Sequence, residues 1–162
     1  MGTRSGDIDP SIIFHLINQL GYSPEEVNNL LNKKSGMKGL AGFSDMRDIA
    51  AAMKQGDKSA GLSYDIYAYR IKKYIGAFVA ILNGMDAVVF TAGVGENDAY
   101  LRKSVCEDME YLGLQLDHQK NKYMSGELRE INKGDSPVKI LVIPTDEEFE
   151  IARQCYSLVS GF

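Results

Sequence analysis

The stretch AVVFTAGVGEN, residues 87–97, decides the fold class predicted for this chain of 162 residues. Its first four residues are apolar and rich in valine, which is typical of a short buried strand. The remaining residues, 91–97, are here called the glycine turn, because Gly93 and Gly95 stand one residue apart in it. A helical pattern follows over about residues 98–112. A strand, a turn and a helix in succession predict an α/β fold.

The sequence on both sides of this stretch predicts further helices and strands. Helices are expected at residues 10–21, 24–36, 45–54 and 64–82, with a last one after residues 145–148. Their expected N-caps are Asp9, Ser23 and Ser44, and the segment TDEE, residues 145–148, is expected to cap the last helix. Residues 138–143, bounded by two prolines, are the stronger strand candidate, and residues 114–116 and 128–131 are weaker ones. Because neither a repeat nor a linker divides residues 1–162, we expect a single domain.

Composition narrows the class of protein. Hydrophobic residues make up 44% of the chain, and a chain of this length buries enough surface to fold without a disulfide or a metal. The formal net charge of −4 argues against a dedicated nucleic-acid-binding protein. The two cysteines and two histidines are too far apart for a zinc pattern: Cys106, Cys155, His15 and His118.

The hydropathy of the chain indicates a soluble protein. No signal peptide is visible in the first residues, and the longest apolar stretch, residues 75–82, is far shorter than the roughly 20 residues of a membrane span. We therefore expect a cytoplasmic protein with reduced cysteines that binds neither membranes nor nucleic acids.

The glycine turn is the first motif that carries chemistry. Glycines let backbone N–H groups approach a ligand closely, and the N-terminus of the following helix favours an anion. Ligands of open α/β sheets bind beyond the carboxyl ends of the strands, where this turn is expected. We expect a positive φ at Gly95. A structural turn without a ligand is an equal alternative, because the full dinucleotide-binding fingerprint is missing.

A second motif, GTRSGD at residues 2–7, places Arg4 in a polar loop just before a helix. A guanidinium group suits bidentate recognition of a phosphate or a carboxylate. Taken alone, an exposed terminus is the favoured alternative. Because no element precedes the loop to hold it, we expect Arg4 to be mobile and the natural sequence to continue upstream.

Two further motifs lie at the starts of expected helices. The carboxylates of TDEE, residues 145–148, suit a hard cation such as Mg²⁺, although acidic residues in a first turn also complement the helix dipole. The segment SDMRD, residues 44–48, suits a polar cradle for a base or a ribose, or simply a capped helix.

Taken together and in this order, the four motifs resemble those of the acetate kinase family. The segments that carry the resemblance are MGTRSGDIDP (1–10), SDMRDI (44–49), DAVVFTAGVGEN (86–97) and IPTDEE (143–148). The resemblance extends over essentially all 162 residues but covers only the second half of the family's chain.

The resemblance implies the actin/Hsp70/sugar-kinase (ribonuclease H-like) type of fold, with a mixed sheet and flanking helices. This chain would be the C-terminal, adenine-nucleotide-binding domain, and the N-terminal half would be absent. The implied activity is reversible, Mg²⁺-dependent phosphoryl transfer between ATP and acetate, which gives acetyl phosphate and ADP. The fragment alone would be inactive, would meet acetate only with the missing half, and would contribute to a homodimer.

The resemblance also assigns roles to residues. It places Arg4 on the family's active-site arginine and Glu147 on its magnesium-associated glutamate. The nucleotide contacts that it implies are Asp45, Met46 and Arg47 around the adenine, and Gly93, Val94, Gly95, Glu96 and Asn97 in the glycine turn. Two alternatives stay open: a stand-alone nucleotide-binding or dimerisation module without catalysis, and half of a propionate or butyrate kinase.

Overall fold

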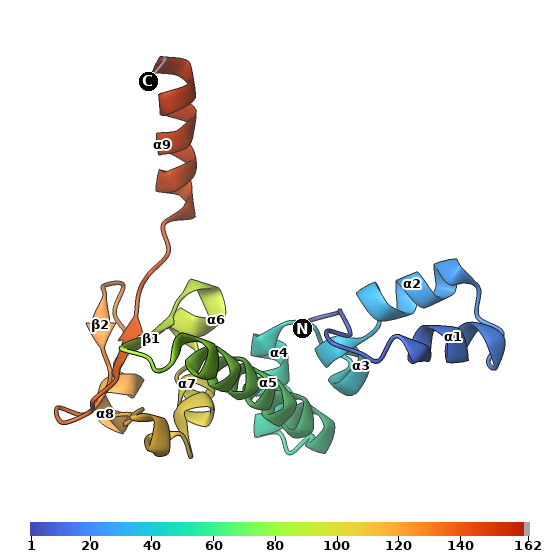
Figure 1. Cartoon of the computed structure of the whole chain (residues 1–162), viewed down its shortest axis with the longest axis horizontal. Helices are drawn as coiled ribbons and strands as arrows, with labels where there is room; N and C mark the ends of the chain where they lie inside the picture. Colours follow the sequence, from blue (N-terminus) through green and yellow to red (C-terminus); the bar gives the residue numbers. More distant parts are fainter. Residues whose placement is uncertain (161–162) are drawn as a thin grey trace. The chain divides into compact units, whose positions relative to one another are not determined.

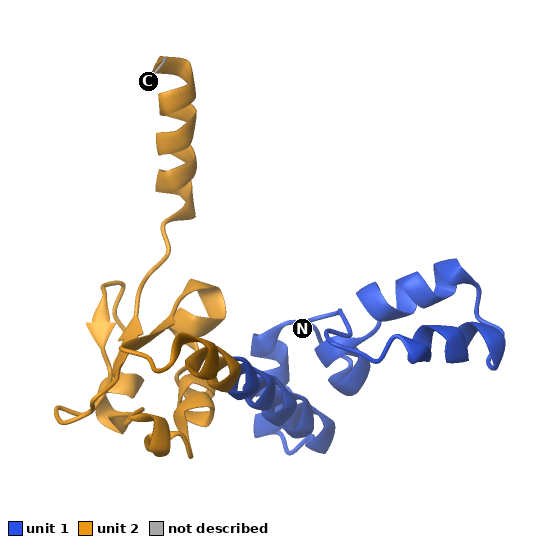
Figure 2. Cartoon of the chain, in the orientation of Figure 1, with its two compact units in different colours: residues 1–74 blue, residues 75–162 orange. Residues whose placement is uncertain are grey.

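The computed structural model describes residues 1–160 of the chain, which forms two compact units, Met1–Tyr74 and Ile75–Phe162 (Figure 2). The boundary between them falls inside the longest helix, α5 (Lys58–Leu82), which begins earlier than expected. The single domain expected over residues 1–162 stays a prediction.

The first unit consists of helices (Figure 1): α1 (Ser11–Asn18), α2 (Pro24–Lys33), α3 (Gly36–Ala41), α4 (Met46–Lys54) and the first part of α5. The N-cap predicted at Ser23 is confirmed as a capping box. Ser23 Oγ accepts from the N–H of Glu26 at 3.2 Å, and the Glu26 carboxylate accepts from the N–H of Ser23 at 2.8 Å. Helix α4 is capped by Asp45, so the cap expected at Ser44 is wrong by one residue.

The helix expected over residues 24–36 is wrong at its end. Helix α2 stops at Lys33, and Gly36, with φ +60°, begins α3. A Cβ at Gly36 would lie 2.1 Å from the carbonyl oxygen of Met1, so the N-terminal residues pack directly on this glycine. The buried apolar residues of the unit are Val27, Met37, Ile49, Ala60, Tyr64 and Ala68.

The second unit contains a mixed three-stranded sheet in the order β1-β3-β2. Strand β1 (Ala87–Phe90) is parallel to β3 (Lys139–Val142), and β2 (Arg129–Glu130) is antiparallel to β3 (Figure 1). The strand predicted at 87–90 is thus confirmed with the same bounds, and those predicted at 128–131 and 138–143 are confirmed with shorter bounds. The candidate at 114–116 forms only two isolated bridges, from Leu114 to Val138 and from Leu116 to Asn132.

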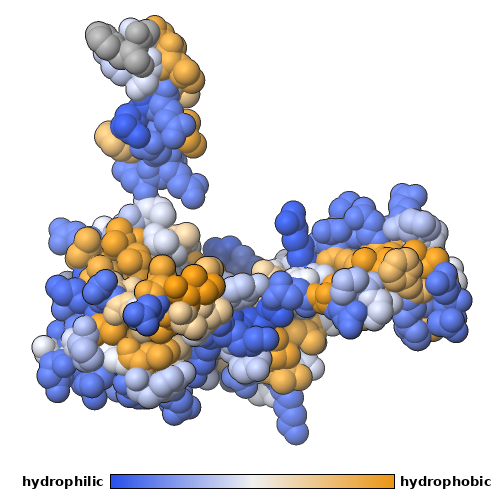
Figure 3. All heavy atoms as spheres, viewed as in Figure 1, coloured by the Kyte–Doolittle hydropathy of each residue, from blue (hydrophilic) through white to orange (hydrophobic). Residues whose placement is uncertain are grey.

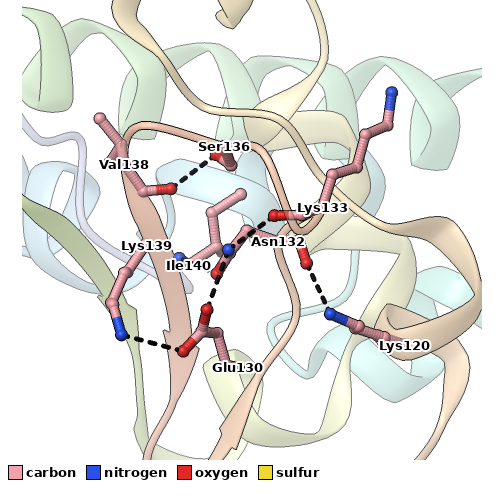
Figure 4. A network of polar contacts seen from close by, with 8 residues as sticks. All are labelled: Lys120, Glu130, Asn132, Lys133, Ser136, Val138, Lys139 and Ile140. Atoms are coloured by element: carbon pink, nitrogen blue, oxygen red, sulfur yellow. Dashed lines mark hydrogen bonds and ion pairs between the residues drawn. The ribbon is translucent and has the colours of Figure 1, made fainter.

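A buried asparagine continues the pairing of β2 and β3 beyond the strands (Figure 4). Asn132 Oδ1 accepts from the N–H of Ile140 at 2.9 Å, and its Nδ2 donates to Glu130 Oε1 at 3.1 Å. Lys139 pairs with the same Glu130 carboxylate at 3.2 Å. Asn132 is 2% exposed, so these bonds remove the cost of burying its amide.

The helix expected over residues 98–112 is wrong, because the chain breaks into shorter elements there. They are α7 (Ala99–Cys106) and a 3-10 turn (Glu110–Leu112). Helix α6 (Ala92–Asn97) comes before them, and α8 (His118–Lys122) follows. The glycine turn is therefore itself helical. The positive φ expected at Gly95 occurs at Ala92 instead, with φ +59°, so a residue with a Cβ adopts the left-handed conformation where the chain leaves β1.

The last helix, α9 (Glu147–Ser160), has no buried residue. Within the capping segment expected at residues 145–148, the cap is Asp146, whose Oδ1 accepts from the N–H of Phe149 at 2.9 Å. Figure 3 shows apolar side chains at the surface of this helix; its exposed large ones are Phe149, Ile151, Tyr156, Leu158 and Val159. Among residues 1–160, no helix has the length and apolarity needed to cross a bilayer.

Candidate functional site

The two glycines of the glycine turn have different surroundings. A Cβ at Gly95 would lie 3.2 Å from the carbonyl carbon of Phe90, so this glycine lets α6 approach β1 closely. A Cβ at Gly93 would meet nothing within 4 Å. Gly95 is therefore required by packing, whereas Gly93 leaves open space in which a ligand can approach the backbone.

The backbone of the glycine turn is held by Arg102, a fully buried arginine of α7. Its Nη1 donates to the carbonyl oxygens of Gly95 at 2.8 Å and Glu96 at 2.9 Å. Its Nε and Nη2 donate to the side chain and backbone of Asn121 at 2.8 and 2.9 Å. Burial lowers the pKa of Arg102, but an arginine stays protonated, so these oxygens stabilise a buried positive charge.

Glu96 joins the glycine turn to the segment that precedes α9. Its Oε1 accepts from both the backbone N–H and the hydroxyl of Thr145, at 2.8 and 2.9 Å. These bonds, the backbone one first, lower the pKa of Glu96, which is therefore ionised at neutral pH. The Glu96 carbonyl also accepts from Arg129 Nη2 at 3.0 Å.

A polar hollow of about 300 Å³ opens beside the glycine turn, at the carboxyl ends of β1 and β3. This is where ligands of α/β sheets bind. Its lining residues are Glu96, Asn97, Met124, Ser125, Gly126, Val142 and Pro144.

Glu147 begins α9, two residues after Thr145. No group of three or more histidine, cysteine, aspartate or glutamate residues that could hold a metal occurs within residues 1–160. Mg²⁺ needs no such cage, because proteins typically hold it by one or two carboxylates together with phosphate oxygens and water. A single carboxylate such as that of Glu147 is compatible with a site of this kind.

The loop that carries Arg4 is held in place by backbone hydrogen bonds. Ser5 N–H donates to the Leu31 carbonyl at 2.8 Å, and the Thr3 carbonyl accepts from the N–H of Ser35 at 3.0 Å. Two more bonds of this kind lead from the carbonyls of Met1 and Gly2 to α3. Although no element precedes this loop, residues that follow it in the sequence hold its backbone in place. The mobility expected for Arg4 stays a prediction.

Asp7 ties the same loop to α5. The Asp7 carboxylate forms an ion pair with Arg70 and accepts from the hydroxyl of Tyr74 at 2.7 Å. The hydrogen bond from Tyr74, followed by the charge of Arg70, lowers the pKa of Asp7. By contrast, the side chain of Arg4 is exposed and has no ion pair or hydrogen bond within residues 1–160, so it is available to a ligand.

The segment Asp45, Met46, Arg47 is held by its own residues. Asp45 accepts from the Arg47 backbone at 2.8 Å and pairs with its guanidinium group at 2.7 Å. These bonds, from the side chain of Arg47 first, lower the pKa of Asp45 to about 2. The Arg47 side chain is 90% exposed.

The predicted site residues fall into two sets. Arg4 and residues 45–47 lie in the first unit, whereas residues 93–97 and Glu147 lie in the second. Within the first unit the two motifs are neighbours, because a Cβ at Gly2 would lie 3.2 Å from the carbonyl oxygen of Ser44.

Comparison with known proteins places these motifs in one family. The family model described as "Acetokinase family" matches residues 1–153, which include all four motifs. The chain belongs to the acetokinase family. It is 56% identical over 161 residues to an acetate kinase of Flavobacterium johnsoniae and 53% identical over 161 residues to one of Oleidesulfovibrio alaskensis. It covers 41% and 40% of their lengths, and 99% of this chain matches in each case.

Solved structures of the acetokinase family share this fold. The acetate kinase of Porphyromonas gingivalis matches with a TM-score of 0.90 and 44% identity, over 98% of this chain and 40% of that one. A propionate kinase from Francisella tularensis matches with a TM-score of 0.85 and 43% identity, over 94% and 38%. The α/β fold with a mixed sheet and flanking helices, which the resemblance implied, is confirmed. The chain spans about 40% of the length of these relatives.

Sequence reasoning missed Arg102, Arg129 and Thr145 as partners of the glycine turn. Arg102 had one signal: a charged residue within an apolar face of α7, between the buried Leu101 and Val105. Thr145 was assigned to a helix cap, which is the common role of a threonine before a helix. Its actual partner, Glu96, is too distant in the sequence for any local pattern to indicate.

Proposed function

We propose that this chain is the nucleotide-binding part of an acetate kinase, which transfers a phosphoryl group reversibly between ATP and acetate. The observation that carries the proposal is the glycine turn at the carboxyl end of β1, with open space at Gly93 and a polar hollow beside it. Residues 93–95 and Asn97 would contact the nucleotide there, and residues 45–47 would lie around the adenine.

The chemistry needs no nucleophile from this chain, because acetate supplies it. A carboxylate oxygen of acetate attacks the γ-phosphorus, the bond to the β–γ bridging oxygen breaks, and ADP leaves with that oxygen. Arg4 would hold the transferring group, since a guanidinium can bridge carboxylate and phosphoryl oxygens as charge spreads between them. Positioning and charge neutralisation supply most of the catalysis of such a reaction.

Glu147 is the residue of this chain that would hold magnesium. Bound there, Mg²⁺ would neutralise charge on the polyphosphate. The Asp146 cap and the two bonds of Thr145 fix the backbone just before Glu147, so its carboxylate is presented from an ordered segment.

Acetate binding would need residues beyond these 162, because relatives of this chain are about two and a half times as long. The exposed apolar side chains of α9 support this, since an amphipathic helix normally buries that face. We infer that the chain alone binds nucleotide without turning over, that the whole protein is a cytoplasmic homodimer, and that its partners are adenine nucleotide and acetate.

Propionate is the second candidate substrate. A propionate kinase shares this fold at 43% identity, so the nucleotide-binding part alone does not distinguish the two acids. Both candidates predict the same behaviour for the 162-residue chain.

The proposal is tested by titrating the chain with Mg-ADP in a calorimeter, and by assaying acetyl phosphate formation before and after adding the separately expressed upstream part. We expect binding by the chain alone, and turnover only after the upstream part is added. Absence of heat and of NMR shift changes at millimolar Mg-ADP contradicts nucleotide binding. Substantial turnover by the chain alone contradicts its role as one part of a longer enzyme.

A further inference from the structure

We propose that Glu96 and Thr145 form a link that positions Glu147 relative to the glycine turn, and that Glu96 acts as a positioning residue rather than as a nucleotide ligand. The inference rests on the proposed function, because it concerns how the nucleotide-binding turn and the metal-binding residue are positioned relative to each other.

The link continues the pairing of β1 and β3 beyond the end of the sheet. The last paired residues of the two strands are Phe90 and Val142. Beyond them, the N–H of Ile143 donates to the Phe90 carbonyl at 2.9 Å, and the hydroxyl of Thr91 donates to the Ile143 carbonyl at 2.8 Å. The two bonds from Thr145 to Glu96 come next, so the segment leaving β3 follows the one leaving β1 as far as Thr145.

Both the backbone and the side chain of Glu96 are held by hydrogen bonds. Its carbonyl oxygen accepts from Arg102 and Arg129, and its carboxylate accepts from Thr145. Arg102 is fully buried, so the backbone of Glu96 cannot shift without disturbing the core of its unit. A movement of the glycine turn would therefore be transmitted to the segment that carries Glu147.

The chemistry of a carboxylate also favours positioning over phosphate binding. An ionised carboxylate has no proton to donate to phosphate oxygens, and its charge repels theirs. Glu96 Oε1 already accepts hydrogen bonds from the backbone N–H and the hydroxyl of Thr145. In a nucleotide site, Glu96 can keep the glycine turn and Glu147 at a fixed distance from each other. Residues that orient a metal ligand in this way commonly change metal affinity by about 10- to 100-fold when they are replaced.

The test measures the affinity of the 162-residue chain for ADP twice, in EDTA and in Mg²⁺, and takes the ratio as the metal-dependent gain. Glu96→Ala should reduce this gain about 10-fold, with ADP affinity in EDTA nearly unchanged. Thr145→Val loses the hydroxyl bond but keeps the backbone N–H bond, so it should reduce the gain by a smaller factor. Thr145→Ser and Glu96→Gln should restore most of it, because each keeps a group that can form the link. Glu147→Gln should abolish the gain, and Glu148→Gln, a matched exposed neighbour, should leave it intact.

Two results would overturn the link. One is a full metal-dependent gain in both Thr145→Val and Glu96→Ala. The other is a loss of ADP affinity in EDTA for Glu96→Gln as large as for Glu96→Ala, which would make Glu96 a ligand through its charge. Melting temperatures of all variants distinguish these results from loss of folding. Failure of the unchanged chain to bind ADP under both conditions would instead remove the proposed function itself.

Discussion

The glycine turn and the segment at residues 45–47 are both predicted to contact nucleotide, but they are held in opposite ways. The glycine turn depends on side chains from elsewhere in its unit: Arg102, Arg129 and Thr145. The other segment depends on the pair between Asp45 and Arg47, two residues apart and largely exposed. The first is therefore rigid before a ligand arrives, and the second can exchange Arg47 for a ligand at little cost.

The largest expected effect on stability comes from replacing Arg102, the buried side chain that holds the glycine turn. Arg102→Met leaves the Gly95 carbonyl and Asn121 Oδ1 without their donor in the core, and it removes one of the two donors to the Glu96 carbonyl. We expect a loss of about 3 kcal/mol or more in the free energy of unfolding, measured in urea. Arg47→Met is the matched control and should change it by less than about 0.5 kcal/mol. Equal losses would contradict the contrast between the two segments.

Arg4 combines features of both segments, since its backbone is held and its side chain is free. In the full-length enzyme, Arg4→Ala should reduce kcat by about 10²-fold, the usual effect of removing one preorganised donor to a transition state. Arg4→Lys should also be poor, because a point charge does not replace a bidentate group. Steady-state assays with acetate and ATP measure both. Near-normal turnover of the lysine variant would mean that Arg4 supplies only positive charge.

Valine substitutions at Gly95 and Gly93 test separately whether the glycine turn is needed for packing and whether it is needed for ligand binding. Gly95→Val should lower stability by about 1–3 kcal/mol, because its Cβ would press on the Phe90 backbone. Gly93→Val should fold normally, since nothing lies within 4 Å of its Cβ, and should weaken ADP binding about 10-fold. Thermal unfolding and calorimetry make the comparison. Normal ADP affinity in Gly93→Val would favour a purely structural turn.

The smallest effect on stability is expected from the exposed ion pair between Asp45 and Arg47. The pKa of Asp45, about 2 in the folded chain, lies below its ordinary value of 3.8. The pair therefore contributes its full stabilisation above about pH 3.8 and loses it as the pH falls towards 2. Asp45→Asn, which keeps an N-cap, should be slightly less stable than the unchanged chain at pH 7, and the difference should disappear as the pH falls through 2. A difference in melting temperature that stays constant over this range would exclude the ion pair as its cause.

The sequence by itself determined those features whose partners are close in the chain. The capping box at Ser23 joins residues three apart, and the strand at residues 87–90 follows from an apolar run. The four motifs and their order were also sufficient to indicate the family, because each is a short contiguous segment.

Tertiary structure decided the features whose partners are distant. Within the capping segment at residues 145–148, Asp146 caps α9, whereas Thr145 binds Glu96, 49 residues away. Gly95 is needed because α6 lies against β1, although its φ is not positive. Arg102 is buried because it meets Asn121 and the carbonyls of the glycine turn. A local pattern reports what a residue can do, and the surrounding packing then selects which partner it meets, since a buried polar group must be paired wherever the fold places it.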